Sequence, residues 1–161
     1  MMSQVEHTSL LLVATDIDDE TPQVLAAVQE RALAEGALDC VLVPLHMKKG
    51  RTGIRIEILC QPSDRSRFVL FLLQETTTLG VRVTEVDRYS LPRHFGTVEV
   101  MGAKVRVKIA SVGGVIIRSA PEFDDCRSLA ERNAIPVREV LARARRAADD
   151  LFPPGTLLEG E

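Results

Sequence analysis

The first half of the chain alternates between apolar runs of strand length and amphipathic stretches of helical length. Residues 9–15 form a continuous apolar run, which predicts a buried strand. Thr21 and Pro22 then start a helix, because the Thr hydroxyl can cap the first turn and Pro lacks the N–H that would be unpaired there. Gly36 is placed to end this helix. Further segments follow in the order strand, strand, helix, strand, at residues 38–44, 54–59, 65–74 and 81–89. This order predicts the ferredoxin-like arrangement, in which two helices cover one face of an antiparallel sheet.

The second half has a different pattern, with three short strands and then two helices. We expect strands at residues 98–100, 104–109 and 115–117, a short helix ending near residue 133, and an amphipathic helix over residues 136–151. In the middle strand, apolar residues alternate with Lys104, Arg106 and Lys108, so one face joins a core and the other is positive. The predicted fold class is therefore α+β. A ferredoxin-like β-α-β-β-α-β first half precedes a three-stranded β-meander and two C-terminal helices. We expect a single domain over residues 1–161, with a core at about 9–152 and disordered termini.

Composition and charge narrow the classes of function. The chain has 161 residues, of which 45% are hydrophobic and 27% charged, as expected for one globular domain. A net charge of -3 argues against general binding of nucleic acid or of an anionic membrane, which requires a dominant basic face. No apolar run approaches the ~18 residues that cross a bilayer, and the first eight residues lack the pattern of a signal peptide, so we expect a cytoplasmic protein. The three cysteines show no CxxC spacing, which favours neither a disulfide framework nor a zinc knuckle.

A cluster of cations follows the second predicted strand. Lys48, Lys49 and Arg51 lie in the connection to the next strand, with Gly50 and Gly53 beside them. Ammonium and guanidinium groups bind phosphate through charge-assisted hydrogen bonds, and glycine lets backbone N–H groups approach its oxygens. The segment predicts an anion site. The alternative is an ordinary solvated hairpin tip.

Acidic residues gather at two junctions between elements, at Asp16, Asp18, Asp19 and Glu20 and again at Glu122, Asp124 and Asp125. Carboxylates beside a polyphosphate are typical of a bound Mg²⁺ or Mn²⁺, which takes oxygen ligands from both. The alternative for Asp18 and Asp19 is that they favour the positive end of the following helix. Three threonines after Glu75, at 76–78, are poor helix formers and offer three hydroxyl groups at a helix end.

Several segments together resemble one family. They are Asp16-Ile17-Asp18-Asp19, Gly36-Ala37-Leu38-Asp39, Met47-Lys48-Lys49-Gly50-Arg51, Glu75-Thr76-Thr77-Thr78-Leu79-Gly80-Val81-Arg82, Arg88-Tyr89-Ser90-Leu91-Pro92-Arg93 and Pro121-Glu122-Phe123-Asp124-Asp125-Cys126. The chain is similar, from about residue 14 to 148, to the C-terminal domain of the proteins that insert nickel into the pincer nucleotide cofactor of lactate racemase. The resemblance implies binding of CTP with Mn²⁺ or Mg²⁺. In that family the full protein uses CTP, releases pyrophosphate and activates the pincer nucleotide as a CMP adduct before nickel enters.

The resemblance also implies the site residues. At CTP and its phosphates it places Lys48, Lys49, Arg51, Glu75, Thr76, Thr77, Thr78 and Arg82, with Arg88 and Arg93 from a further shared segment. The cations Lys104 and Lys108 of the positive strand face are added to this predicted set because of their charge. At the divalent metal it places Asp16, Asp18 and Asp19, with Glu122 and Asp124 as further candidates. The chain departs from the family pattern at Ala14, where a carboxylate is usual, and at Thr52, where proline is usual. Asp16 is the candidate to replace the missing carboxylate.

The resemblance has consequences for partners. The larger N-terminal domain of the family, with its metal-binding histidines, is not in this sequence, so we expect a separately encoded N-terminal partner and no nickel insertion by this chain alone. The remaining expected partners are CTP, the pincer nucleotide precursor, Ni²⁺ as a substrate, and further copies of the chain in a homo-oligomer. Two other interpretations remain open: a stand-alone nucleotide-binding or regulatory module, and a plain anion-binding ferredoxin-like domain.

Overall fold

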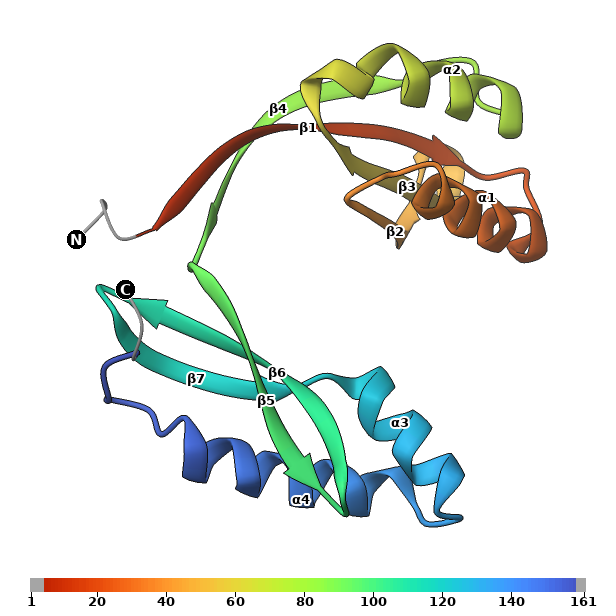
Figure 1. Ribbon diagram of the computed structural model, residues 1–161. Helices are drawn as coiled ribbons and strands as arrows, with labels where there is room; N and C mark the ends of the chain where they lie inside the picture. The colour runs from red at the N-terminus through yellow and green to blue at the C-terminus, as the bar shows by residue number, and fades with distance from the viewer. Residues whose placement is uncertain (1–4, 159–161) are drawn as a thin grey trace. The chain divides into compact units, whose positions relative to one another are not determined.

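The computed structural model describes residues 5–158, and within them the chain forms two compact units (Figure 1). We call residues 7–88 the N-terminal unit and residues 89–158, with residues 5 and 6, the C-terminal unit. Each unit has its own cluster of buried hydrophobic residues. The single domain expected from the sequence stays a prediction, and the expected disorder of residues 1–4 and 159–161 lies outside the described part. No helix within residues 5–158 has both the length and the apolar character needed to cross a membrane.

The N-terminal unit has the predicted ferredoxin-like topology. Its elements are β1 (Glu6–Ile17), α1 (Pro22–Ala34), β2 (Asp39–His46), β3 (Thr52–Cys60), α2 (Arg65–Glu75) and β4 (Arg82–Ser90), and the outer ends of β1 and β4 run past the unit boundary. The strands form one antiparallel sheet in the order β2-β3-β1-β4. Thus β1 is central and longer than predicted, because it continues through polar residues at both ends of its apolar run.

Both helices of this unit bury one face against the sheet. Leu25 and Val28 of α1 and Phe68 and Leu72 of α2 join inward-facing strand residues such as Ile56 in one core. The start of α1 is as predicted. The Thr21 Oγ accepts a hydrogen bond from the Val24 N–H. At the other end of α1, Gly36 has a φ of +96°, which glycine adopts without strain. Helix α2 begins without such a cap, since the Asp64 side chain makes no capping bond and pairs with Arg67 instead.

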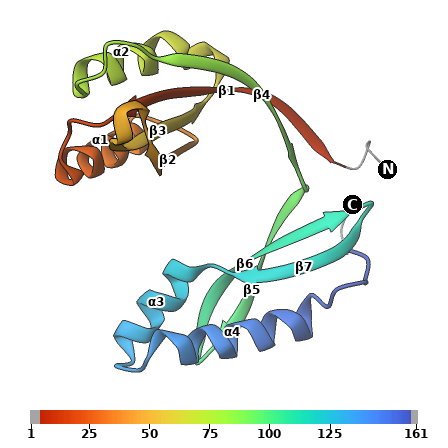
Figure 2. The same cartoon turned by 180° about the vertical axis from the view of Figure 1, so that it is seen from behind.

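The C-terminal unit is a meander covered by two helices (Figure 2). Its elements are β5 (Arg93–Val100), β6 (Ala103–Val112), β7 (Val115–Pro121), α3 (Phe123–Arg132) and α4 (Val137–Leu151). Val105 and Val107 of β6 pack with Val140 and Ala144 of α4 in its core. The strands extend beyond the predicted ranges because only one of their faces is apolar, which leaves their polar ends without a sequence signal.

The segment after α4 and the outer face of strand β6 complete the C-terminal unit. Residues 153–158, which we expected to fray, return to β7, where Val115 pairs with Leu157 and the Leu158 N–H donates to the Gly114 carbonyl at 2.8 Å. On β6, the residues Lys104, Arg106 and Lys108 are exposed on the face away from the core, as predicted. The C-terminal unit thus has one apolar and one positive sheet face.

Candidate functional site

Sheet topology gathers the candidate residues of the N-terminal unit at one end of its sheet. Strand β3 pairs with β1 so that Ile54 lies opposite Ile17, and the β2–β3 hairpin turn follows at that same end. Strand β4, which neighbours β1 on the other side, begins there with Arg82. The β1–α1 connection, the hairpin turn and the α2–β4 connection are therefore neighbours, although they are distant in sequence.

The hairpin turn has an unusual backbone. Residues 48–50 form a 3₁₀ turn in which Lys49 has a φ of 64° and Gly50 a φ of 70°. A left-handed conformation is uncommon for lysine and is found most often where the surrounding structure or a function requires it. The Met47 N–H donates to the Arg51 carbonyl at 2.8 Å and closes the turn. The side chains of Lys48 and Lys49 are consequently held on an exposed, tightly closed loop.

Gly53 has a packing role that differs from the predicted one. It lies within β3, and a Cβ atom there would be 2.6 Å from the Met47 Sδ and 2.7 Å from the Ile17 carbonyl oxygen. These distances are shorter than side chains tolerate, so glycine is needed for β1 and the turn to approach. Gly50, with its φ of 70°, lies in the turn itself, and the approach of its backbone N–H to a phosphate oxygen stays a prediction.

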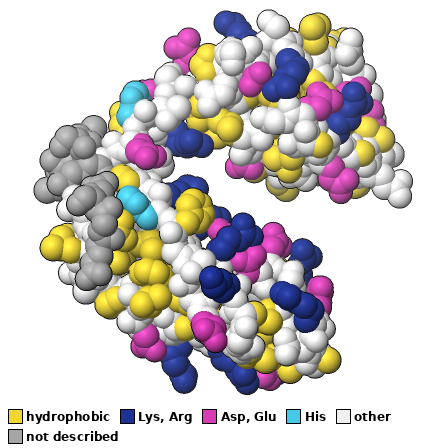
Figure 3. Space-filling model, viewed as in Figure 1, with side chains coloured by type: hydrophobic (Ala, Val, Ile, Leu, Met, Phe, Trp, Pro, Cys, Tyr) yellow, Lys and Arg dark blue, Asp and Glu magenta, His cyan; other side chains and the backbone are white. Residues whose placement is uncertain are grey.

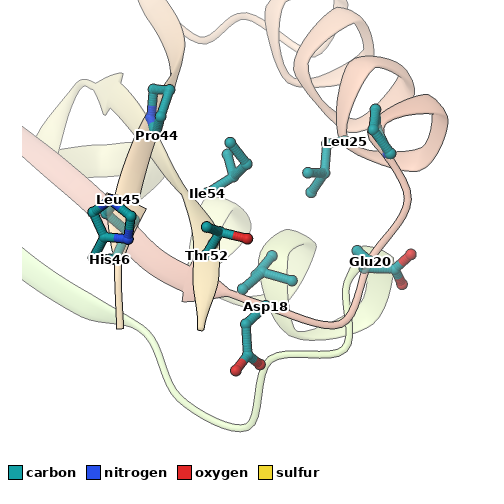
Figure 4. Close-up of a pocket in the computed structure, with 11 residues that line it drawn as sticks. Asp18, Glu20, Leu25, Pro44, Leu45, His46, Thr52 and Ile54 are labelled. Atoms are coloured by element: carbon teal, nitrogen blue, oxygen red, sulfur yellow. The ribbon is translucent and has the colours of Figure 1, made fainter. Parts of the chain in front are cut away.

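A pocket of about 420 Å³ opens beside this turn. It is lined by the end of β1, the first turn of α1 and the facing ends of β2 and β3, with Asp18, Glu20, His46 and Thr52 as its polar residues (Figure 4). Pro44, Leu45, Ile54 and Leu25 supply apolar walls. Such a combination of apolar walls with few polar groups is typical of small-molecule sites.

The acids of the β1–α1 connection are in contact with two of the other loops. Asp18 pairs with Arg51 of the turn at 3.0 Å, and the Thr77 hydroxyl donates to Asp19. Lys48 and Lys49, in contrast, have no acidic partner within 4.0 Å among residues 5–158. Two cations of the predicted phosphate site therefore keep their charges uncompensated by the described chain.

Asp16 occupies the centre of an arginine pair. Its carboxylate accepts from Arg55 Nε at 2.6 Å and from Arg82 at 2.7 Å. Chiefly because of the hydrogen bond from Arg55, with a further contribution from Arg82 and partial opposition from burial, the Asp16 pKa falls to about 2. Asp16 is thus engaged as a counter-ion that joins β1, β3 and β4.

The residues around the three threonines have separate partners. Thr76 donates to the Leu72 carbonyl at 2.7 Å, and Thr78 donates to the Gly80 carbonyl at 2.9 Å while also contacting Thr15. These bonds end α2 and connect it to β1, so two of the three hydroxyls have a structural explanation. Glu75 pairs with Arg31 of α1 at 2.6 Å. Only Thr77 turns to the acidic loop.

The donor atoms suit a hard cation, although no metal cluster is formed. Within residues 5–158, no group of three His, Cys, Asp or Glu side chains is close enough to hold a metal ion. Asp18, Asp19 and Thr77 offer oxygen atoms, which Mg²⁺ and Mn²⁺ prefer and which do not select Ni²⁺. The set fits a cation shared with phosphate oxygens, because the chain itself supplies only part of a coordination shell.

The remaining predicted residues lie elsewhere. Arg88 is near the end of β4, and the C-terminal unit contains Arg93, Lys104, Lys108, Glu122 and Asp124. There, Lys108 pairs with Glu122 at 2.8 Å and Asp124 with Arg127 at 3.1 Å. The predicted set is therefore divided between the two units.

Some participants were missed by sequence reasoning. Arg55, which alternates with isoleucines in β3, was not among the predicted site residues, although it lies opposite Asp16 in the strand register. Thr15 was predicted only as the end of an apolar run. In the structure its side chain is 1% exposed and its hydroxyl forms a hydrogen bond with the Thr78 hydroxyl. The pairing of Arg106 with Asp125 was also missed. The Arg106 side chain donates two hydrogen bonds, of 2.9 and 2.7 Å, to the Asp125 carboxylate, and this pairing lowers the Asp125 pKa to about 2.

Comparison with known proteins gives the family. The family model described as nickel insertion protein matches residues 1–141. A relative from Dictyoglomus thermophilum is 40% identical over 86% of this chain and 36% of its own length. A Thermotoga relative, a pyridinium-3,5-bisthiocarboxylic acid mononucleotide nickel insertion protein, is 33% identical over 84% of this chain and 34% of its own length. The chain therefore spans about a third of the length of the curated relatives it matches.

Solved structures locate the match within that family. One is described as LarC2, the C-terminal domain of a cyclometallase involved in the synthesis of the NPN cofactor of lactate racemase, in its apo form. It superimposes with a TM-score of 0.84 at 34% identity, over 89% of this chain and 99% of that domain. The structure of protein MK0293 from Methanopyrus kandleri matches with a TM-score of 0.67 at 30% identity, over 89% of each chain. The chain belongs to the nickel insertion protein family and corresponds to its C-terminal domain.

Proposed function

We propose that this chain is the CTP-binding part of a nickel insertion enzyme, and that it works with the N-terminal region found in its longer relatives. The observation that carries the proposal is the uncompensated pair Lys48 and Lys49 on a closed turn beside the Asp18-lined pocket, in a chain of this family. In an acidic chain, two adjacent cations that no described acid compensates form a local positive site that is available to an anion.

The triphosphate would lie against the hairpin turn. Lys48 and Lys49 act as movable point charges, whereas Arg51 offers a planar fork that leaves Asp18 to bind phosphate oxygens. The ribose and base would enter the adjoining pocket, where His46 and Thr52 can donate or accept hydrogen bonds. The apolar walls at Leu25 and Ile54 exclude water from the base.

A divalent cation would lie between the phosphates and the acidic loop. When bound, Mg²⁺ or Mn²⁺ neutralises phosphate charge and orients the triphosphate. Asp18 and Asp19 would supply carboxylate oxygens to it and Thr77 a hydroxyl. Asp16 instead holds Arg55 and Arg82 in place, which positions Arg82 at the edge of the same site.

Titration calorimetry tests the binding step. CTP, ATP, GTP and UTP are titrated into the chain with and without Mn²⁺, and we expect CTP to bind best and only with the metal at full affinity. Equal binding of the four nucleotides would contradict CTP selectivity. The absence of binding by all four would contradict the nucleotide site altogether.

Reconstitution tests the enzymatic role. The chain is incubated with the bis-thiocarboxylated pincer precursor, CTP, Mn²⁺ and Ni²⁺, with and without the N-terminal region of a longer relative, and activation of apo lactate racemase is measured. We expect activation only when the N-terminal region is present. Nickel binding favours imidazole and thiolate ligands, and the described residues of this chain gather no such cluster. Activation by the chain alone would overturn the division of labour.

A further inference from the structure

A second cationic surface lies on the C-terminal unit, on the face of the β5-β6-β7 sheet that points away from α4. Arg93 pairs in register with Ala110, and Ala110 with Arg118, so the two arginines flank one small residue from adjacent strands. Lys108 is two residues before Ala110 and shares its face. These residues line a pocket of about 320 Å³, and Figure 3 shows Lys and Arg side chains gathered with hydrophobic atoms over this unit.

The charges of this surface are only partly compensated. Lys108 pairs with Glu122 at 2.8 Å. Arg93 and Arg118 have no acidic partner within 4.0 Å in the described part of the chain. Like charges this close repel one another, and the repulsion is relieved when an anion binds between them. The small side chain of Ala110 leaves the room that such an anion needs.

An exposed aromatic ring adjoins these cations. Phe95 is 67% exposed, pairs in register with Lys108 and lies two residues from Arg93 on the same face. A single exposed hydrophobic residue is ordinary by itself. Beside three cations, however, Phe95 gives the surface a flat ring on which another ring can stack, in addition to groups that bind acidic substituents.

We propose that this face binds the pyridinium mononucleotide on which the enzyme acts, an inference that rests on the proposed function. The name of the Thermotoga relative describes a pyridinium ring that carries two thiocarboxylic acids and belongs to a mononucleotide. Such a ligand has a cationic ring suited to the face of Phe95 and acidic groups suited to Arg93, Lys108 and Arg118. Arg93 and Lys108, which the sequence analysis assigns to CTP, then serve this second ligand.

Nicotinic acid mononucleotide is the probe, because it combines a pyridinium ring, a carboxylate and a phosphate. It is titrated into the intact chain by calorimetry and compared with CTP plus Mn²⁺ and with inorganic phosphate. Replacing Arg118 with Ala should weaken nicotinic acid mononucleotide about tenfold or more, and Phe95→Ala about fivefold or more. Neither change should alter CTP affinity. Arg143→Ala, which removes an equally exposed cation from α4, is the matched control and should have no effect.

The outcomes separate this inference from the proposed CTP site. The double change Lys48→Ala and Lys49→Ala should weaken CTP and leave nicotinic acid mononucleotide unaffected. No binding of the probe, or loss of probe binding only in the Lys48 and Lys49 variant, would overturn the inference while CTP binding still stands. Equal affinity for inorganic phosphate with no effect of Phe95→Ala would overturn the role of the ring. Melting temperatures verify folding, and Arg118→Gln replaces Arg118→Ala if the latter is unstable.

Discussion

The arginine–aspartate pairs of the two units differ in the number of arginines that bind each aspartate. In the N-terminal unit one carboxylate, Asp16, holds two arginines from different strands, Arg55 and Arg82. In the C-terminal unit one arginine, Arg106, satisfies Asp125 alone through its side chain and its backbone N–H at 3.0 Å. The first arrangement ties three strands together, whereas the second ties the start of α3 to the middle strand.

Each unit also has cations without an acidic partner among the described residues, and these cations lie on different kinds of surface. The N-terminal unit has Lys48 and Lys49 on a hairpin turn, and the C-terminal unit has Arg93 and Arg118 on a sheet face, none of them with an acidic partner among residues 5–158. Paired charges have already exchanged water for a fixed partner, so they contribute mainly to geometry. Uncompensated charges remain available to a ligand, and the two units offer them in different shapes, a loop beside a pocket and a sheet beside a ring.

The largest effect is expected from removing both lysines of the turn. Each charge-assisted bond to phosphate contributes roughly 1.5 to 3 kcal/mol, so the double change Lys48→Ala and Lys49→Ala should weaken CTP by about a hundredfold or more. The melting temperature should stay within about 1 °C, since the turn is exposed and these side chains make no ion pair among the described residues. Calorimetry and thermal melts measure both quantities. A collapsed melting temperature with intact affinity would show that the lysines are structural.

Glycine substitutions compare the packing of the two units. Gly53→Ala in β3 meets the Ile17 backbone, which cannot rotate away, and should cost about 1–3 kcal/mol of unfolding free energy. Gly96→Ala in β5 meets the ring of Phe152 at 2.5 Å, which can move, so its cost should be smaller. Gly80→Ala has open space around it and is the control. Urea denaturation gives the order, and a Gly80 variant as unstable as the Gly53 variant would contradict the explanation.

Acid stability tests the two aspartates. Both have a folded-state pKa of about 2, below the ordinary value of 3.8, so each stabilises the fold above about pH 4 and this contribution is lost as the pH falls toward 2. Asp16→Asn should lower the unfolding free energy at pH 7 by about 1 kcal/mol after allowance for solvent screening, and Asp125→Asn by a similar amount. Both differences from the wild type should shrink on acidification between pH 4 and 2. A difference that stays constant with pH would rule out the ion pairs as its source.

The smallest effect is expected from a single hydroxyl group. Thr76→Val removes the bond to the Leu72 carbonyl at the end of α2 and should cost about 0.5 kcal/mol of unfolding free energy, the lower end expected for a neutral hydrogen bond. Thr97→Val is the matched control on the C-terminal unit, because Thr97 is an exposed strand residue whose hydroxyl has no hydrogen-bond partner among the described residues. Thermal melts compare the two. If Thr76→Val has the stability of the wild type, the hydroxyl has no structural role, and its predicted role in nucleotide binding would be favoured.

Much of the architecture followed from residue patterns. The order of strands and helices, the Thr21 cap, the Gly36 end of α1 and the positive face of β6 are local or periodic properties, and each is found in the structure. The predicted strands were shorter than the observed ones, because consecutive polar residues at the ends of a strand show no alternation of apolar and polar positions. The family was also recognisable, because short runs of specific residues carry the resemblance.

The tertiary structure decided which charged residues have partners. The resemblance placed Asp16 among the metal ligands and did not include Arg55 in the site. The antiparallel register sets these two residues opposite each other and pairs them as counter-ions, while the metal role of Asp16 stays a prediction. The tertiary structure likewise places the hydroxyls of Thr76 and Thr78 in hydrogen bonds to backbone carbonyls. Four cations have no acidic partner among the described residues: Lys48, Lys49, Arg93 and Arg118. Pairing depends on distances between segments that are tens of residues apart, and only the sheet, which brings those segments together, fixes them.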